Sequence, residues 1–372
     1  MAHKGHVALF LATSGHSGVE RVMGNLMRGM LDQGLQVDLL RIKNHGPTKD
    51  RLPQNINILE FPTAHVNSAL PHLVGYLKRH RPDALLTDKD RVNRVAILAN
   101  LLSSARIRHV VRIGTTVTPN LRRRSFMARH SQLLSIKLLY PLADAVLVPS
   151  HGAGRDLESI APKLKGRVHV VASPVVDPAL HEMAANSPGH PWLTPKTAPV
   201  ILGAGELCGR KDFATLIRAF CLVRQRLDAR LIILGKGKDA PRLKLMVKEL
   251  GLDHLVDFPG FVKNPLSYMA RADCFCLTSR CEGMPVVLIE ALALGIPVCA
   301  TDCPSGPRDV LQDGKAGRLV RVGDFRALSE AIIDVIKNPP PGHALKQAVG
   351  KYSISKGTMD YLKWLLPNSR TA

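Results

Sequence analysis

Aromatic residues are scarce in this sequence, and it contains no long apolar run. Phe, Trp and Tyr make up 4% of the 372 residues, which argues against a surface that binds single-stranded nucleic acid by base stacking. No run of about 18 apolar residues occurs, so a membrane-spanning helix is not expected. The N-terminus leads straight into the strand-like segment 6–12, which argues against a cleaved signal peptide.

Cysteine is also scarce, and its placement argues against two kinds of site. All seven cysteines lie between Cys208 and Cys303, with no CxxC pair among them. This odd number indicates reduced thiols in the cytoplasm rather than a disulfide framework, and it gives no case for zinc. Cys274 and Cys276 lie in an apolar strand-like run, most simply as small core residues.

Acidic residues are too few to balance the basic ones. The chain holds 51 Lys and Arg against 30 Asp and Glu, a formal net charge of +21, and residues 1–180 alone hold 25 basic and 12 acidic residues. Such a field attracts phosphate-rich partners. Nucleic acid, an anionic membrane surface and phosphorylated substrates all remain open.

Short β-type runs alternate with helical segments in both halves of the chain, which predicts an α/β protein with parallel sheets. The expected strands are 6–12, 36–42, 84–87, 109–113, 145–148 and 168–171, then 200–202, 230–234, 256–258, 274–277, 297–300 and 318–322. A proline-rich stretch between the halves indicates a linker. We therefore expect an N-terminal domain at 1–175, a linker at 176–198, a C-terminal domain at 199–342, and a last helix, roughly 345–366, within 343–372 that either stays there or crosses back.

One carboxylate stands in an otherwise apolar helix. Pro285 suits a first helical position and Gly295 a left-handed cap, and apolar residues cover every face between them except at Glu290. Carboxylates are seldom buried without a partner. Glu290 therefore forms an internal salt bridge, caps a neighbouring loop or binds a ligand.

A second carboxylate, Glu282, stands just before this helix in Glu282-Gly283-Met284-Pro285. The unpaired N–H groups and positive dipole end of a helix N-terminus attract anions. Two carboxylates on either side of such amides suit a ligand that carries both hydroxyls and phosphate, as a nucleotide sugar does.

Loops that follow other strands carry further phosphate-type residues. The glycine-containing loop 13–20 opens a helix, and its His16 is either an acceptor contact or a solvated residue. The loop 203–211 places Arg210 and Lys211 at a helix start, where cations oppose the dipole unless an anion binds there. Gly235-Lys236-Gly237 is most simply a tight turn.

Two segments each have two interpretations. Asp88-Lys89-Asp90 is similar to the DxD pairs that hold a divalent metal, but Asp90 equally suits the cap of the helix that follows, and we expect no metal. Residues 120–140 are basic at the start and apolar later. They form either an interfacial helix on acidic lipid headgroups or a core helix with a solvated basic end.

In order along the chain, these motifs resemble the retaining GT-B glycosyltransferases of family 4, a group that includes lipopolysaccharide and capsule enzymes. The resemblance covers nearly the whole chain. Its most specific part is Glu282-Gly283-Met284-Pro285 with Glu290, followed by 295–298 and Thr301. Weaker matches lie at 18–22, 148–150, 174–175, 260–262 and 303–308.

The resemblance implies two Rossmann-like domains facing across a cleft, with the donor on the C-terminal one. It implies that Glu282 contacts the donor sugar, Glu290 the nucleotide ribose and Lys211 the diphosphate. Backbone contacts are implied for Gly283, Met284 and Pro285 beside the diphosphate, for Gly18 from the opposite domain, and for Val262 beside the base. Glu206 replaces the usual arginine, so one phosphate contact is missing or is supplied by Arg210.

Many family members carry a histidine near the transferred sugar, but the corresponding region here reads Arg112-Ile113-Gly114-Thr115-Thr116. His16 and Arg112 are the remaining candidates on the acceptor side. The family's retaining transfer is thought to need neither an enzyme nucleophile nor a metal, because cations and amides stabilise the departing diphosphate. We therefore expect no cofactor.

The sequence thus predicts a cytoplasmic glycosyltransferase, peripheral at the inner face of the plasma membrane. It would move a sugar from a nucleotide-sugar donor to a lipid-linked or saccharide acceptor in cell-envelope polysaccharide or lipopolysaccharide synthesis. The alternatives are a nucleotide-sugar epimerase on the same fold and a basic nucleic-acid-binding protein without catalysis. The acidic pair argues against nucleic acid as a partner, since carboxylates in a cleft repel a polyanion.

Overall fold

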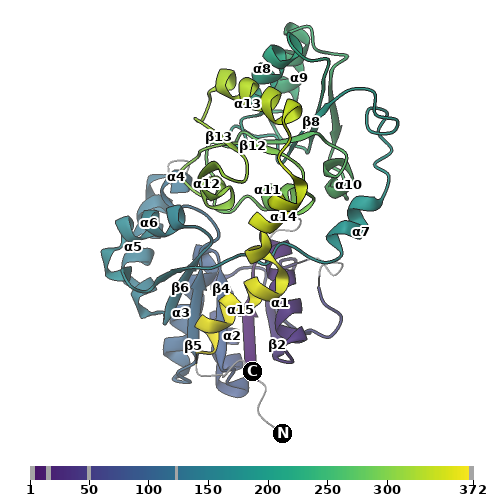
Figure 1. Ribbon diagram of the computed structural model, residues 1–372. Helices are drawn as coiled ribbons and strands as arrows, with labels where there is room; N and C mark the ends of the chain where they lie inside the picture. The colour runs from purple at the N-terminus through teal and green to yellow at the C-terminus, as the bar shows by residue number, and fades with distance from the viewer. Residues whose placement is uncertain (1–4, 14–17, 48–51, 122–124, 368–372) are drawn as a thin grey trace. The chain divides into compact units, whose positions relative to one another are not determined.

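The computed structural model describes residues 5–13, 18–47, 52–121 and 125–367. Contacts divide the chain into two compact units (Figure 1). The first unit comprises Met1–Val175 together with Tyr352–Ala372, and the second comprises Val176–Lys351. The residues that close the first unit therefore come from the far end of the sequence.

The first unit is built on a parallel sheet with the strand order β3-β2-β1-β4-β5-β6-β7. Its strands are β1 (His6–Phe10), β2 (Gln36–Ile42), β3 (Asn57–Phe61), β4 (Ala84–Asp88), β5 (Arg108–Arg112), β6 (Ala145–Val148) and β7 (Val168–Val170). All of β1 and β4 is buried, as expected for parallel strands covered on both faces. The register of β4 with β5 places Asp88 beside Arg112.

Helices cover the first sheet, and the last of them comes from the C-terminal segment. They are α1 (Gly18–Asp32), α2 (Leu70–His80), α3 (Asp90–Ser103), α4 (Thr118–Leu121), α5 (Phe126–Leu138), α6 (His151–Ile160) and α15 (Ile354–Leu365). The α15 helix, yellow in Figure 1, packs against α1, β4 and β5. Its Trp364 ring stacks on His169, with ring centroids 3.5 Å apart.

The second unit has the strand order β10-β9-β8-β11-β12-β13, again parallel. Its strands are β8 (Val200–Ala204), β9 (Arg230–Leu234), β10 (Val256–Gly260), β11 (Cys274–Leu277), β12 (Val298–Thr301) and β13 (Arg318–Val320). Its helices are α7 (Leu180–Ala185), α8 (Phe213–Arg224), α9 (Ala240–Glu249), α10 (Pro265–Met269), α11 (Val286–Ala293), α12 (Pro307–Val310), α13 (Phe325–Lys337) and α14 (Gly342–Ala348). The α7 helix, within the expected linker, packs against α10.

The core of the second unit contains a cluster of three thiols. Cys274, Cys276 and Cys299 are at most 1% exposed, and the Cys274 sulfur lies 3.8 Å from each of the other two. They pack among the apolar side chains of β8, β9, α8 and α13. All seven cysteines carry free thiols.

The expected strands are confirmed to within about two residues, but one strand was missed and one predicted helix needs correction. The strand β3 was not predicted, because its exposed edge residues break the apolar pattern. The predicted last helix, 345–366, is wrong: it divides into α14 and α15, and the Ser353 hydroxyl accepts from the Lys356 N–H to cap α15. The segment 120–140 combines features of both interpretations: Ile136 is buried in the core with Leu133 and Leu139 packed against it, whereas residues 125–131 are exposed.

Within the part of the chain that the structure describes, no helix combines the length and apolar character needed to cross a membrane.

Candidate functional site

Three donors converge on one carboxylate in the loop after β11. Glu282 Oε1 accepts from Lys211 Nζ at 2.6 Å, from the Ser279 hydroxyl at 2.7 Å and from Arg210 NH1 at 3.4 Å. The side chains of Glu282 and Lys211 are only 7% and 12% exposed, and that of Arg210 is 28% exposed. The structure therefore brings together the predicted sugar-contacting acid and both predicted phosphate-binding cations.

Glu282 is held in its charged form at this position. Burial acts to raise the pKa of its carboxyl group. The charges of Lys211 and Arg210 and the hydrogen bonds from Lys211 and Ser279 lower this pKa by more than burial raises it, so the net effect is a lowered pKa. The neighbouring Cys303 thiol is affected in the opposite sense. Burial and the Glu282 charge raise its pKa to about 12, so this thiol stays neutral.

The segment Thr278–Arg280 holds the backbone that carries the two cations. The Thr278 hydroxyl donates to the Lys211 carbonyl at 2.9 Å, and the Arg280 N–H donates to the Arg210 carbonyl at 2.8 Å. The Arg280 guanidinium also pairs with Asp212 at 2.8 Å. The positions of Lys211 and Arg210 are thus fixed by the neighbouring loop as well as by Glu282.

Glycines allow the loops after β8 and β9 to meet closely. A Cβ atom at Gly235 would lie 1.8 Å from the Gly205 carbonyl oxygen, so no larger residue fits there. Gly205 has φ 156°, and a Cβ atom on it would lie 3.1 Å from Lys211 Cε. The Gly235-Lys236-Gly237 loop is therefore packed onto the loop that carries Lys211, rather than being an isolated turn.

The apolar helix that contains Glu290 is α11, and Glu290 is 1% exposed. This confirms the burial that the sequence predicts. The helix begins at Val286, with Pro285 as its N-terminal cap, one residue later than expected. The Ser305 hydroxyl donates to the Gly283 carbonyl at 3.2 Å and holds the backbone that leads into the helix.

Other residues predicted to bind the donor lie at the ends of the second unit's strands. Glu206 is exposed in the loop after β8, and Val262 is half-buried just after β10. Met284 is half-buried, whereas Gly283 is buried before α11. Arg210, unlike Glu206, supplies a cation beside Glu282, and its contact with a phosphate stays a prediction.

The residues predicted from the first half all belong to the first unit. Gly18 is the exposed first residue of α1, whereas His16 lies outside the described residues. Arg112 is 2% exposed: its NH1 lies 3.2 Å from Asp88 Oδ1, and its Nε donates to the Tyr361 hydroxyl at 2.8 Å. Arg112 is thus a buried pairing residue here, and a contact with the acceptor stays a prediction.

The two carboxylates of Asp88-Lys89-Asp90 have separate partners. Asp88 pairs with Arg112, whereas Asp90 pairs with Arg94 at 3.2 Å and accepts from the Ser135 hydroxyl at 3.1 Å. In the described ranges no group of three or more His, Cys, Asp or Glu residues is arranged to hold a metal ion.

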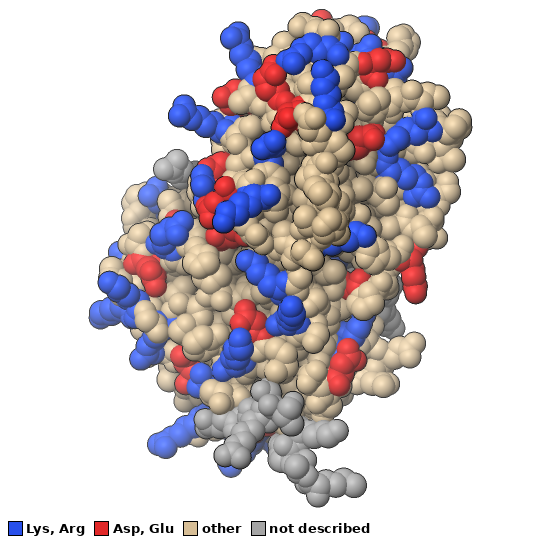
Figure 2. Space-filling model, viewed as in Figure 1, with Lys and Arg blue, Asp and Glu red and all other residues tan. Residues whose placement is uncertain are grey.

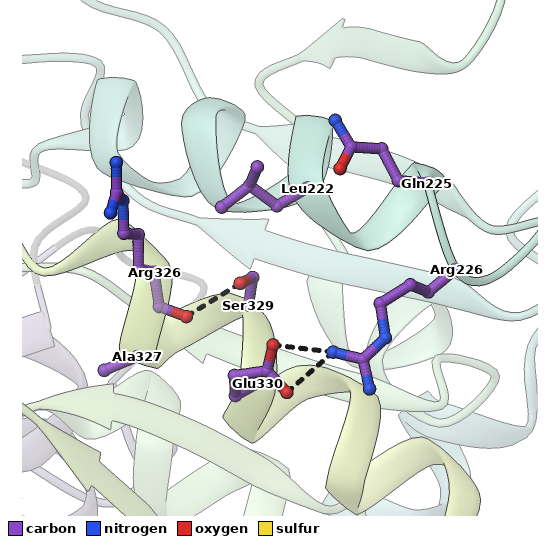
Figure 3. Close-up of a pocket in the computed structure, with 7 residues that line it drawn as sticks. All are labelled: Leu222, Gln225, Arg226, Arg326, Ala327, Ser329 and Glu330. Atoms are coloured by element: carbon purple, nitrogen blue, oxygen red, sulfur yellow. Dashed lines mark hydrogen bonds and ion pairs between the residues drawn. The ribbon is translucent and has the colours of Figure 1, made fainter.

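An open pocket on the second unit, between α8 and α13, lies apart from these residues (Figure 3). Its lining is Leu222, Gln225, Arg226, Arg326, Ala327, Ser329 and Glu330. Arg226 NH1 donates to both carboxylate oxygens of Glu330 at 2.6 and 2.7 Å, and the Ser329 hydroxyl donates to the Arg326 carbonyl at 2.7 Å. Because these polar groups already satisfy one another, the pocket is a poor candidate for the functional site.

Sequence reasoning missed the residues that support Glu282 and Lys211. These are Thr278, Ser279, Arg280 and Asp212; Thr301 was named in the family pattern, but its bond to the Ser279 carbonyl was not predicted. Their only signal in the sequence is position, since hydroxyl residues follow β11 and end β12. Position alone does not say which loop each hydroxyl contacts.

Comparison with known proteins gives matches to both halves of the chain. Residues 190–353 match the family described as Glycosyl transferases group 1, and residues 16–177 match Glycosyltransferase Family 4. The chain is 29% identical to N-acetylgalactosamine-N,N'-diacetylbacillosaminyl-diphospho-undecaprenol 4-alpha-N-acetylgalactosaminyltransferase of Campylobacter jejuni, over 96% of this chain and 99% of that protein.

Solved structures show the same fold at lower identity. Anabaena Alr3699/HepE in complex with UDP is similar with a TM-score of 0.77 and 17% identity, over 96% of this chain and 98% of that one. The lipopolysaccharide outer core galactosyltransferase WaaB in its apo form is similar with a TM-score of 0.73 and 18% identity, over 96% and 98% of the two chains. These likenesses confirm the predicted two-domain α/β fold.

Proposed function

Because the chain belongs to the group 1 glycosyltransferases of family 4, which have the GT-B fold, we propose that it is a retaining enzyme that uses a nucleotide-sugar donor. Its acceptor is a lipid-linked or other saccharide, and its product belongs to cell-envelope polysaccharide or lipopolysaccharide. The observation that carries this proposal is the convergence of Lys211, Arg210 and Glu282 just before the N-terminus of α11.

Each of these groups suits one part of a nucleotide sugar. Lys211, Arg210 and the first N–H groups of α11 suit the diphosphate, since cations and a helix N-terminus both attract phosphate. Glu282 suits the sugar hydroxyls. Glu290, buried in α11, suits the ribose hydroxyls, because a carboxylate accepts hydrogen bonds from hydroxyl donors.

The transfer follows from this arrangement without an enzyme nucleophile. The acceptor hydroxyl attacks the anomeric carbon on the face that the diphosphate leaves. The bond to the diphosphate oxygen breaks as the new glycosidic bond forms, and the departing diphosphate takes the acceptor's proton. Lys211 and Arg210 stabilise the negative charge that develops on the diphosphate.

The comparisons support the choice of donor and acceptor. The similar Campylobacter jejuni protein is named for a diphospho-undecaprenol-linked acceptor, and the similar Anabaena structure contains UDP. A donor of the UDP-sugar type and an acceptor of the lipid-linked type are therefore the first to test.

Thermal unfolding with a panel of nucleotides tests the donor proposal. UDP, GDP, UDP-glucose, UDP-N-acetylgalactosamine and GDP-mannose are each added to the full chain. A true ligand at a hundredfold excess over its dissociation constant adds about 2.7 kcal/mol to the free energy of unfolding, a shift of about 5 to 10 °C. If no nucleotide raises the melting temperature, the proposal fails.

Two other measurements test the alternatives. Release of a free epimer would favour the epimerase alternative, and tight, salt-dependent binding to DNA would favour the nucleic-acid alternative.

We also propose that the first unit docks on the anionic inner face of the plasma membrane through α3 and α5. Bonds from Arg94 to Ser131 and from Ser135 to Asp90 show that the two helices run antiparallel. Large apolar side chains on them are exposed, among them Leu101, Leu102, Phe126, Met127, Leu134 and Leu138, from 55% to 77%. We call this set the lipid face.

Charge complementarity supports an acidic bilayer as the occupant of the lipid face. Arg91, Arg129 and Lys137 are exposed on the same two helices, and residues 1–180 carry a large basic excess. Figure 2 shows lysine and arginine side chains spread over the visible face, with acidic side chains among them, rather than gathered in one continuous stripe. The apolar side chains are therefore the feature that distinguishes the lipid face.

Changing Phe126 and Met127 together to serine is expected to weaken binding to phosphatidylglycerol-containing vesicles at least about tenfold, because two exposed apolar side chains no longer enter the interface. Vesicle co-sedimentation measures this, and Leu245→Ser, at a 57% exposed position in α9, is the matched control. Equal binding by all three proteins would exclude the lipid face as the docking surface.

A further inference from the structure

Ser279 differs in kind from the other two donors to Glu282. Lys211 and Arg210 are the cations assigned to the diphosphate, so a bound donor competes with Glu282 for both of them. Ser279 is neutral and lies three residues before Glu282 in the same loop, with its hydroxyl 2.7 Å from Glu282 Oε1. Because the Ser279 hydroxyl carries no charge, a bound diphosphate does not compete with Glu282 for it as it does for the two cations.

Thr301, the last residue of β12, fixes the position of Ser279. The register of β11 with β12 pairs Leu277 with Ala300 and brings Thr301 beside the loop. The Thr301 hydroxyl lies 2.6 Å from the Ser279 carbonyl oxygen and 3.3 Å from that of Leu277. Ser279 and Thr301 are both fully buried, so this arrangement is shielded from water.

We propose that Ser279 is a positioning residue that keeps the Glu282 carboxylate in place for the donor sugar when the donor diphosphate takes over Lys211 and Arg210. The inference rests on the proposed function. In this proposal Lys211 and Arg210 bind the diphosphate of the donor, whereas the Ser279 hydroxyl holds Glu282 for the sugar. Binding of the diphosphate and binding of the sugar therefore depend on different residues.

The electrostatic setting gives this arrangement a second consequence. Glu282 faces Lys211 and Arg210, and its own charge acts on the Cys303 thiol. Once the two cations bind the diphosphate, the Ser279 hydroxyl still donates to the Glu282 carboxylate and favours its ionised form. Loss of that hydroxyl therefore raises the pKa of Glu282 in the bound state.

The test compares the binding of a nucleoside diphosphate with that of the corresponding nucleotide sugar. Calorimetric titrations use the nucleotide sugar that most raises the melting temperature in the panel above, and its parent diphosphate. Ser279→Ala is expected to leave the diphosphate affinity within about twofold of the unchanged protein and to weaken nucleotide-sugar binding about tenfold. On the acid side, nucleotide-sugar affinity is expected to begin to fall at a higher pH in Ser279→Ala than in the unchanged protein.

Controls separate this role from a general loss of structure. Ser279→Thr, which keeps the hydroxyl, is expected to restore nucleotide-sugar binding. Ser329→Ala, which removes a buried hydroxyl bonded to a backbone carbonyl in α13, is expected to change neither affinity. If Ser279→Ala does not fold, Ser279→Cys supplies a side chain of similar size with a much weaker donor and gives the same readouts.

Equal weakening of both ligands, or no change in either, would overturn the positioning role while the proposed function stands. If the unchanged protein binds no nucleotide of the panel, the proposed function fails first and the inference falls with it.

Discussion

Replacing Lys211 with methionine is expected to weaken nucleotide-sugar binding about a hundredfold. The Lys211 side chain is only 12% exposed and lies 2.6 Å from Glu282, so its charge acts where little water screens it. Methionine keeps most of the volume but removes the charge, and the Glu282 carboxylate then faces the diphosphate with Arg210 as the nearest remaining cation. Losing one partner of such a desolvated contact costs about 2–5 kcal/mol.

Calorimetric titration with the nucleotide sugar that gives the largest thermal shift measures the loss. Lys248→Met removes an equal charge from an exposed position in α9 and controls for the overall field of the protein. Its expected effect on affinity is less than about twofold, because solvent and salt screen exposed charges. A change of less than threefold at Lys211 would show that this lysine does not contact the diphosphate.

Replacing Arg112 with methionine is expected to lower the free energy of unfolding of the first unit by about 3–5 kcal/mol. Asp88 and Arg112 are each 2% exposed and lie side by side at the ends of β4 and β5. Without the guanidinium, the Asp88 carboxylate stays buried without its cation, and the Tyr361 hydroxyl on α15 loses its donor.

The protein offers a fluorescent probe for this measurement. It contains two tryptophans, Trp364 in the first unit and Trp192 in the second, so urea unfolding in a Trp192→Phe background reports on the first unit alone. Lys363→Met is the comparison within the same unit, because its pair with Asp360, at 3.3 Å, is of similar length but far more exposed, at 68% and 29%. Exposed pairs contribute about 0–1 kcal/mol. A loss below 1 kcal/mol at Arg112 would mean that burial does not decide the strength of this pair.

The sequence predicted those features of the fold that depend on local pattern. Parallel strands buried on both faces appear as short apolar runs, so β1, β4, β8 and β11 were found. The burial of Glu290 followed from the apolar faces around it. The edge strand β3 was not predicted, because an exposed edge strand carries polar residues that break the apolar pattern. The break between α14 and α15 was not predicted either, because the cap of α15 depends on the single hydroxyl of Ser353.

Glu282 was predicted from its position just before a helix N-terminus, and three other site residues were predicted because their charge conflicts with local structure. Lys211 and Arg210 oppose a helix dipole, and Glu290 interrupts an apolar helix. Each of these conflicts indicates a ligand or a partner from the sequence alone. Ser279 conflicts with nothing, because a serine in a loop is ordinary. Arg112 was predicted as an acceptor-side residue, and its buried bond to Tyr361 was not predicted, since Tyr361 lies 249 residues away in the sequence and no local pattern connects the two.

The crossing of the chain back into the first unit has a consequence for the order of synthesis. A protein is made from its N-terminus, so residues 176–351 are complete before α15 is translated. The hydrogen bond from the Arg112 guanidinium to the Tyr361 hydroxyl therefore forms only after the whole second unit has been synthesised. The unit that is begun first is therefore the last to be completed, since α1, β4 and β5 lack their contacts with α15 until that helix has been translated.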